Sequence, residues 1–201
     1  MEELDTLAVT VRVLDRGGDY VSGAVAALEV LDTAYLAVDG TGLGLIGRAP
    51  TPTSTTARVV ALSGSLRSDP VAFRVLPAAD TLRGPTASEL TVAAADSASG
   101  PLTTTVVDLT TTPGTSAPLG VRPVRYTLVF PAYADLASAR AVLSNDSLAA
   151  TVLTASTGSA AVAVKRRGTP QPDSAVVLAT AVRGSGATVP GSPVRFVVRF
   201  Q

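Results

Sequence analysis

The side chains of this chain that are capable of catalysis are few in kind. The 201 residues contain no histidine and no cysteine, and Lys165 is the only lysine. Zinc sites of the cysteine–histidine type, cysteine nucleophiles and histidine-based triads are therefore impossible. A serine–lysine or Schiff-base mechanism would have to use Lys165, and no Ser-x-x-Lys pattern precedes it. What remains is carboxylate chemistry, hydroxyl chemistry without an imidazole partner, or no chemistry.

Aspartates are the groups best suited to bind a metal or to act as acids and bases, and they fall into two sets. The first set lies in or beside expected turns, where carboxylates can bind calcium, and comprises Asp15, Asp19, Asp32 and Asp39. The second set offers carboxylates for a glycosidase pair and comprises Asp108, Asp135, Asp146 and Asp173.

Neither set matches a pattern specific to that chemistry. The spacing of the first set is not that of an EF-hand, and aspartate favours turns for its own hydrogen bonds. Nothing in the sequence places two members of the second set in one cleft, and no tryptophan is present as a sugar platform. We therefore expect a protein that is not an enzyme and that has no metal site and no cofactor.

Tyrosines are the candidates for an interface with a partner protein, because tyrosine is favoured at such surfaces. Tyr133 lies in a segment without a repeat and is the better candidate, and Tyr35 is the second. Tyr126 lies in an alternating segment, so we expect it in the core or on a sheet surface. Asn145 begins a glycosylation sequon, a pattern short enough to arise often by chance.

Charge argues against a nucleic-acid partner. The chain has 16 basic and 16 acidic residues, and it lacks the basic excess of nucleic-acid-binding proteins. The only dense basic cluster is Lys165-Arg166-Arg167, which we interpret as a solvated loop. No apolar run reaches the length of a membrane span of about 20 residues. The start, Met1 to Asp5, is acidic and shows no signal peptide.

The elements that position these residues are predicted to be strands. Apolar residues alternate from Leu7 to Val13, which predicts a half-buried strand, and a glycine-bearing turn leads to a second strand over 20–30. Turns recur at intervals typical of a β-sandwich. One exception is the alanine-rich segment 132–140, where a short helix is expected with Asp135 near its start.

Two stretches of the chain are close to repeats of each other. Ser68 to Val75 recurs as Gly191 to Val198, and 57–64 recurs upstream of the second copy as 175–182. This pattern predicts two copies of one all-β module. We expect the first sandwich over 1–80, a linker or crossover strand over 81–101, and the second sandwich over 102–201.

These motifs resemble bacterial immunoglobulin-like domains of the invasin and adhesin type. The motifs are an alternating strand, an Asp-x-x-Gly turn, a Val-x-Gly-Ala-x-Val strand and a closing Pro-Val-x-Phe-x-Val strand. The resemblance implies two tandem immunoglobulin-like β-sandwich domains. It carries no catalytic residues to this chain.

The functional expectation is a non-catalytic structural or docking protein. In this hypothesis it is an accessory subunit that braces a larger bacterial complex, photosynthetic or respiratory, whose partners include integral membrane proteins. Its location would be extracytoplasmic, in the periplasm or on the cell surface. The alternative is an extracellular module for adhesion or for binding carbohydrates or surfaces.

Overall fold

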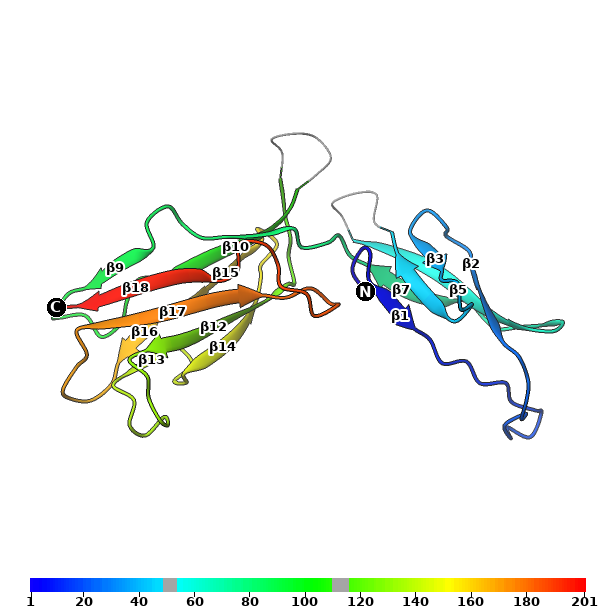
Figure 1. Cartoon of the computed structure of the whole chain (residues 1–201), viewed down its shortest axis with the longest axis horizontal. Coiled ribbons are helices and arrows are strands. Elements are labelled where there is room, and N and C mark those ends of the chain that lie inside the picture. The colour runs from blue at the N-terminus through cyan, green and yellow to red at the C-terminus, as the bar shows by residue number, and fades with distance from the viewer. Residues whose placement is uncertain (49–53, 110–115) are drawn as a thin grey trace. The chain divides into compact units, whose positions relative to one another are not determined.

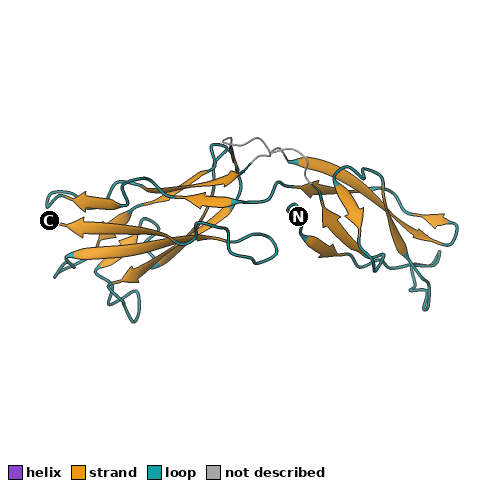
Figure 2. Cartoon of the chain, turned by 45° about the horizontal axis from the view of Figure 1, so that its top comes forward, coloured by secondary structure: helices purple, strands orange, loops and turns teal. Residues whose placement is uncertain are grey.

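The computed structural model describes residues 1–48, 54–109 and 116–201, and every regular element in them is a strand (Figure 2). The chain divides into two compact units, Met1–Ala78 and Ala79–Gln201. None of the described residues belongs to a helix long and apolar enough to cross a membrane. The expected all-β fold is confirmed.

Unit 1 contains two small sheets. One has the order β1-β4-β3, and in the other β5 pairs with β2, β6 and β7. The strands of this unit are β1 (Thr6–Ala8), β2 (Ala27–Val30), β3 (Leu36–Val38), β4 (Gly44–Gly47), β5 (Thr55–Ser63), β6 (Leu66–Arg67) and β7 (Val71–Val75).

Unit 2 contains longer strands. They are β8 (Thr81–Arg83), β9 (Glu89–Val92), β10 (Leu102–Asp108), β11 (Ala117–Pro118), β12 (Pro123–Phe130), β13 (Ala141–Leu143), β14 (Ala149–Leu153), β15 (Ser159–Val162), β16 (Val164–Arg166), β17 (Ser174–Ala181) and β18 (Val194–Phe200). A five-stranded sheet has the order β14-β12-β17-β18-β9, in which only β9 runs parallel to its neighbour (Figure 1).

The strand order of unit 2 is that of an immunoglobulin-like sandwich. In the usual lettering, β8, β10, the β15–β16 pair and β13 are strands A, B, E and D of one layer. The other layer is A′-G-F-C-C′, formed by β9, β18, β17, β12 and β14. Unit 1 follows the same order: β1, β4 and β3 correspond to B, E and D, and β2, β5 and β7 correspond to C, F and G. The expected pair of tandem immunoglobulin-like sandwiches is therefore confirmed.

The core of unit 2 follows from strand alternation. Along β17 every second residue is buried, and β12 places Tyr126 and Val124 in the interior at 0% exposure. The Tyr126 hydroxyl is hydrogen-bonded to the Thr104 hydroxyl at 2.8 Å and donates to the Ala160 carbonyl at 2.7 Å. Its burial raises the pKa of the Tyr126 phenol. Tyr126 is thus a core residue, one of the two places expected for it.

The segment expected as a linker or crossover strand, 81–101, contributes β8 and β9 to unit 2. β9 pairs in parallel with β18, the closing strand. Arg166 fixes the end of β9, because its Nη2 donates to the carbonyls of Val92, Ala93 and Gln201, and its guanidinium lies 5.5 Å from the Phe200 ring centroid. The sequence boundary at residue 80 lies two residues from the division between the units at Ala78 and Ala79.

The short helix expected over 132–140 is wrong: the segment forms bends and a turn. Ser138 donates its backbone N–H to the Asp135 carboxylate at 2.8 Å, and its hydroxyl donates to the Asp135 carbonyl at 3.0 Å. These bonds close a turn of four residues, which competes with helix formation at aspartate and serine. The hydrogen bonds from Ser138 lower the pKa of Asp135.

Candidate functional site

The two predicted strands of unit 1 nearest the N-terminus are only partly formed. The first was expected over Leu7–Val13, and β1 covers Thr6–Ala8 only; the second was expected over 20–30, and β2 covers Ala27–Val30 only. Alternation persists beyond β1 all the same, because Val9, Val11 and Val13 are half-buried and the residues between them are exposed. The segment 9–13 therefore has the alternating side-chain pattern of a strand, although it belongs to no strand of the sheets.

Backbone hydrogen bonds show which side of this segment is unpaired. Val9 donates to the Leu43 carbonyl at 2.9 Å, Gly47 donates to the Asp5 carbonyl at 3.0 Å, and Val21 donates to the Val13 carbonyl at 2.9 Å. The odd-numbered residues thus bond toward β4 and the returning arm of the hairpin. In an antiparallel ladder, the residues between them point their N–H and C=O groups to the opposite side. We call that side, at residues 6–12, the open edge.

In unit 2 the equivalent edge is occupied. Val106 of β10 donates to Gly158 at 2.9 Å, next to β15, whereas Val107 accepts from Asp80 at 3.0 Å. β8 therefore pairs with β10 on the side opposite β15, at Thr105–Val107. In unit 1, β1 lies at the end of its sheet, and no strand in the described ranges pairs with the open edge. Among the described residues of unit 1, no strand takes the place that β8 has beside β10 in unit 2.

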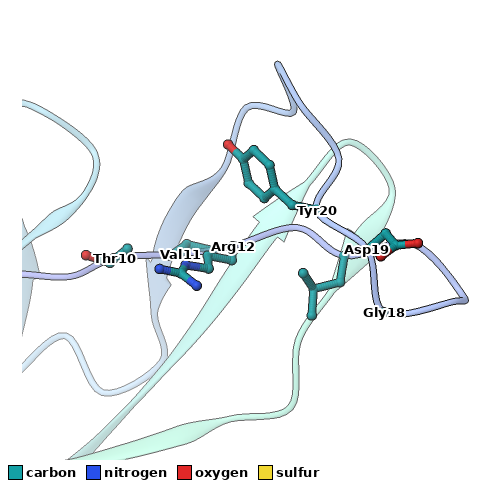
Figure 3. Close-up of a pocket in the computed structure, with 7 residues that line it drawn as sticks. Thr10, Val11, Arg12, Gly18, Asp19 and Tyr20 are labelled. Atoms are coloured by element: carbon teal, nitrogen blue, oxygen red, sulfur yellow. The ribbon is translucent and has the colours of Figure 1, made fainter.

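The unpaired segment borders two hollows, and both are lined by Thr10, Val11 and Arg12. A cavity of about 370 Å³ lies between residues 9–12 and the strands β2, β5 and β7, with an apolar lining that includes Val59, Val71 and Phe73. A second cavity of about 530 Å³ lies between residues 10–14 and the hairpin turn. Figure 3 shows Thr10, Val11 and Arg12 on one length of chain and Asp19 and Tyr20 on its return. We call these two cavities the N-terminal cleft.

Large apolar side chains around the N-terminal cleft are exposed. Val25 is 83% exposed, Tyr20 64% and Leu14 53%. The fully enclosed cluster of unit 1 is correspondingly small, comprising Leu36, Leu45, Ala57, Val59 and Val75. Because the sandwich is not closed on this side, the apolar residues of segment 9–25 have too little protein to pack against.

The charged side chains that line the cleft carry both signs, because Asp19 lines the 530 Å³ cavity together with Arg12. Arg12 lines both cavities, and neither Arg12 nor Arg16 forms a hydrogen bond or an ion pair with another described residue. The Asp15 carboxylate already accepts the backbone N–H groups of Gly17 at 2.8 Å and Asp19 at 3.0 Å. The N-terminal cleft therefore presents one guanidinium group, Arg12, and one carboxylate, Asp19, beside apolar surface.

The aspartates considered for calcium are used in local structure. Hydrogen bonds from Arg58, through its side chain and backbone, lower the pKa of Asp32, and the two residues form an ion pair at 3.0 Å. The hydroxyl of Thr41, assisted by the Gly44 N–H, lowers the pKa of Asp39. No group of three or more acidic side chains that could hold a metal ion occurs in the part of the chain that the structure describes.

The second set of aspartates is spread over separate connections. Asp146, in the β13–β14 turn, pairs with Lys165 at 3.1 Å, and Asp135 closes the turn with Ser138. Asp108 ends β10, and Asp173 precedes β17. Nothing in these contacts assembles an acid–base pair with a substrate cleft.

The two tyrosines predicted for an interface are both half-buried, and an interface role for them stays a prediction. Tyr133 packs against the core of unit 2, and its buried hydroxyl has no hydrogen-bond partner among the described residues. Tyr35 packs against the core of unit 1. In the basic cluster, Lys165 and Arg166 lie in β16 rather than in a loop, and Arg167 donates to the Leu136 carbonyl at 2.9 Å. Asn145 is exposed in the β13–β14 turn.

The N-terminal cleft was missed by sequence reasoning. Its residues were assigned to two ordinary strands, and Tyr20 was not singled out.

Comparison with solved structures gives similarities of low score. The chain resembles the Yersinia pseudotuberculosis adhesin InvE at 17% identity and a TM-score of 0.44, over 100% of this chain and 56% of that one. It resembles the Escherichia coli adhesin FdeC at 16% and 0.46, over 100% and 60%. Domains 4–9 of the surface layer protein SbsC match at 16% and 0.36, over 98% and 25%. The chain therefore spans between a quarter and three fifths of these structures.

No protein-family model matches the chain, and no curated protein does. The assignment as two immunoglobulin-like sandwiches rests on the strand order within each unit.

Proposed function

We propose that this protein is a non-catalytic, extracytoplasmic adhesion module that holds a partner protein at the N-terminal cleft of unit 1. One observation carries the proposal: exposed apolar side chains and an open strand edge occur at the same place in unit 1. Exposed apolar surface next to unpaired backbone favours association with another polypeptide. The accessory-subunit hypothesis receives no support from this arrangement, because neither unit presents a feature specific to a membrane complex.

Chemistry of the chain supports a binding role. The sequence has no histidine and no cysteine, and Asp32, Asp135 and Asp146 are engaged in ion pairs or turns. Two sandwiches in tandem also suit a surface module. The resemblance to adhesin structures suggests the same class.

The test is adhesion of beads coated with the whole chain to cells of the source bacterium and to candidate host surfaces. Val11→Asp places a charge in the apolar part of the N-terminal cleft, and we expect it to reduce bead retention at least about ten-fold. The matched control is Val182→Asp, at a site in unit 2 that is 48% exposed. Equal retention by both variants would show that the cleft is not the adhesive surface.

A second candidate ligand is a carbohydrate, favoured by one observation. The ring of Tyr20 borders the 530 Å³ cavity together with Thr10, Arg12 and Asp19, a combination of aromatic and polar groups that suits a sugar (Figure 3). Binding of the chain to a glycan array, lost in Tyr20→Ala and retained in Tyr35→Ala, would favour this ligand over a protein.

A further inference from the structure

We propose that a second copy of this chain pairs with unit 2 along strand β14, so that the five-stranded sheets of the two copies continue into each other across a two-fold axis. This inference goes beyond the proposed function, because it assigns a self-association surface to unit 2 and does not involve the N-terminal cleft. The contact consists of the backbone groups of Thr151 and Leu153 and of the Val152 side chain between them.

Strand β14 is an edge strand without the features that usually protect one. It lies at the end of its sheet, and β12 is its only partner among the described strands (Figure 1). Its five residues, Ala149–Leu153, include no charge, no proline and no glycine. At the other end of the same sheet, β9 carries Glu89 in an ion pair with Arg199. Charge, proline and short length are common means of preventing edge-to-edge pairing, so β14 is the edge of this sheet best suited to it.

Backbone bonding shows which residues of β14 face away from β12. Thr154 donates to the Arg122 carbonyl at 2.9 Å, and the Leu148 carbonyl accepts from Leu128 at 2.8 Å. Even-numbered residues of this segment therefore bond toward β12. In an antiparallel ladder, the residues between them direct their N–H and C=O groups to the other side. The residues of β14 that do so are Ala149, Thr151 and Leu153.

Local contacts limit the available part of this edge to Thr151 and Leu153. The Ala149 carbonyl already accepts hydrogen bonds from two side chains of the β13–β14 turn. Beyond the other end of the strand, the Ala155 N–H already donates to the Ser159 carbonyl at 2.8 Å. No described strand pairs with the residues between these two points on this side. The available stretch therefore offers two N–H groups and two C=O groups.

These four backbone groups are complementary to those of a second copy. In an antiparallel pair with Val152 of each copy at the two-fold axis, Thr151 lies opposite Leu153 of the other copy. Each of the two Thr151–Leu153 pairs then exchanges two hydrogen bonds. The alternative register, with Thr151 opposite its equivalent, would place Leu153 opposite Ala149, whose carbonyl already has partners. The contact therefore uses the same residues on both copies, as an isologous dimer requires.

Side chains on both faces of the sheet favour the same register. Leu153 is 59% exposed on the outer face, where Thr151 of the second copy covers it. On the inner face, Val152 is half-buried against the core of unit 2. It meets the equivalent valine in a non-hydrogen-bonded pair, in which side chains approach most closely. Burial of these apolar groups adds to the backbone bonds, and β14 carries no charge that opposes it.

Sedimentation equilibrium of the whole chain at increasing concentration is the first test. Because each copy contributes one short strand, we expect a weak dimer with a dissociation constant between about 1 µM and 1 mM. A chain that stays monomeric up to about 1 mM would overturn the proposal.

A backbone variant tests whether the β14 edge forms the contact. Thr151→Pro removes an N–H that faces the second copy and is compatible with an edge strand. Because the axis repeats this loss, we expect dimerisation to weaken at least about ten-fold. Thr151→Val keeps the N–H and is the matched control. Equal dimerisation by the two variants would show that this edge is not the contact.

Two double variants test the register. Thr151→Glu with Leu153→Glu places carboxylates opposite each other, whereas Thr151→Glu with Leu153→Lys places opposite charges there. We expect the second variant to dimerise at least about five-fold more tightly than the first. Equal affinities would contradict the Thr151–Leu153 pairing. Thr91→Lys, at an exposed position of β9 in the same sheet, is the control and is expected to leave dimerisation unchanged.

Amide hydrogen exchange locates the contact in the unaltered chain. Raising the concentration is expected to slow exchange at Thr151 and Leu153 and to leave Val152 unchanged, because the Val152 amide faces β12. Protection at β9 or in unit 1 instead would mean that the copies pair along another edge, and the β14 contact would be wrong. Circular dichroism checks that each variant folds, and the exchange pattern decides the matter if Thr151→Pro does not.

The outcomes separate this inference from the proposed function. If bead retention depends on Val11 and the chain is monomeric, the cleft is adhesive and the β14 contact is wrong. If the chain dimerises with protection at Thr151 and Leu153, but Val11→Asp leaves bead retention unchanged, the β14 contact stands and the adhesive role of the cleft fails.

Discussion

Strand β10 of unit 2 and the β1 segment of unit 1 occupy the same place in two sandwiches of the same order, and they differ in their neighbours. β10 has β8 on one edge and β15 and β11 on the other, and its residues Leu102, Thr104 and Val106 are buried at 1% exposure or less. β1 has β4 alone, and its central residue Leu7 is 40% exposed. Two sandwiches with the same strand order can therefore differ in how deeply the corresponding strands are buried.

The difference shows how strand pairing controls burial. The added strand in unit 2 is only three residues long, but it carries Leu82 into the interior and holds β10 in register. Without it, the chain beyond β1 separates from the sheet, and the apolar residues of the hairpin remain in solvent. A sandwich that lacks one edge strand thus loses packing on both of its layers.

The largest expected effect is on the closed core. Phe196→Ala removes a ring that is 0% exposed in unit 2, and we expect it to lower the free energy of unfolding of that unit by about 3–5 kcal/mol. The matched change in unit 1, Phe73→Ala, affects a half-buried ring beside the cleft and is expected to cost less. Hydrogen exchange at increasing denaturant reports each unit separately. An equal loss of unfolding free energy in both units would contradict the difference in packing between the core of unit 2 and that of unit 1.

Loss of one hydroxyl tests the polar contacts of the closed core. Tyr126→Phe leaves the Thr104 hydroxyl and the Ala160 carbonyl without this partner, so unit 2 is expected to lose about 1–3 kcal/mol. Tyr35→Phe is the control in unit 1, where we expect a change within about 0.5 kcal/mol. Urea unfolding followed by circular dichroism measures both changes.

Alkaline pH sharpens the same comparison. The folded-state pKa of Tyr126 is raised above its ordinary value of 10.0 by burial. Its contribution to stability is therefore complete below pH 10 and is lost as the pH rises through the raised pKa. We expect unit 2 to lose stability above pH 10, and we expect this additional loss to be absent in Tyr126→Phe. A loss of the same size in the variant would assign the effect to another group.

Acid pH is expected to act on unit 1 through Asp32. Because the folded-state pKa of Asp32 lies below its ordinary value of 3.8, its contribution is present above pH 3.8 and is lost as the pH falls through the lowered pKa. Asp32→Asn removes this dependence and leaves the rest of the acid profile in place. Exchange rates of β5, measured between pH 5 and pH 2.5 and corrected for intrinsic rates, provide the test.

The smallest expected effect is at the exposed apolar surface. Val25 is 83% exposed, so Val25→Thr is expected to change the stability of unit 1 by no more than about 0.5 kcal/mol. The same substitution at Val177, which is 0% exposed in unit 2, is expected to cost about 1–3 kcal/mol. A large effect of Val25→Thr on the isolated chain would mean that Val25 is packed in solution.

Several features of this protein were determined by its sequence alone. Alternation with a period of two predicted the side-chain faces of residues 9–13 correctly, and the repeated Pro-Val-x-Phe pattern identified the last strand of each unit. Both are local properties: a side chain's face follows from its position in an extended chain. The absence of histidine and cysteine likewise restricted the chemistry without any reference to the fold.

Pairing was decided by the tertiary structure. Thr81-Leu82-Arg83 is too short and too mixed to predict a strand, and it becomes one because β10 offers it an edge. The Leu7–Val13 pattern is strong, and most of it remains unpaired because no described strand lies beside it. Tyr133 is half-buried and packs against the core of unit 2, a contact that the local sequence does not indicate. A strand is stabilised by its neighbours, which lie far away in sequence, so local pattern determines which face a residue takes and only the assembled sheet determines whether that face is covered.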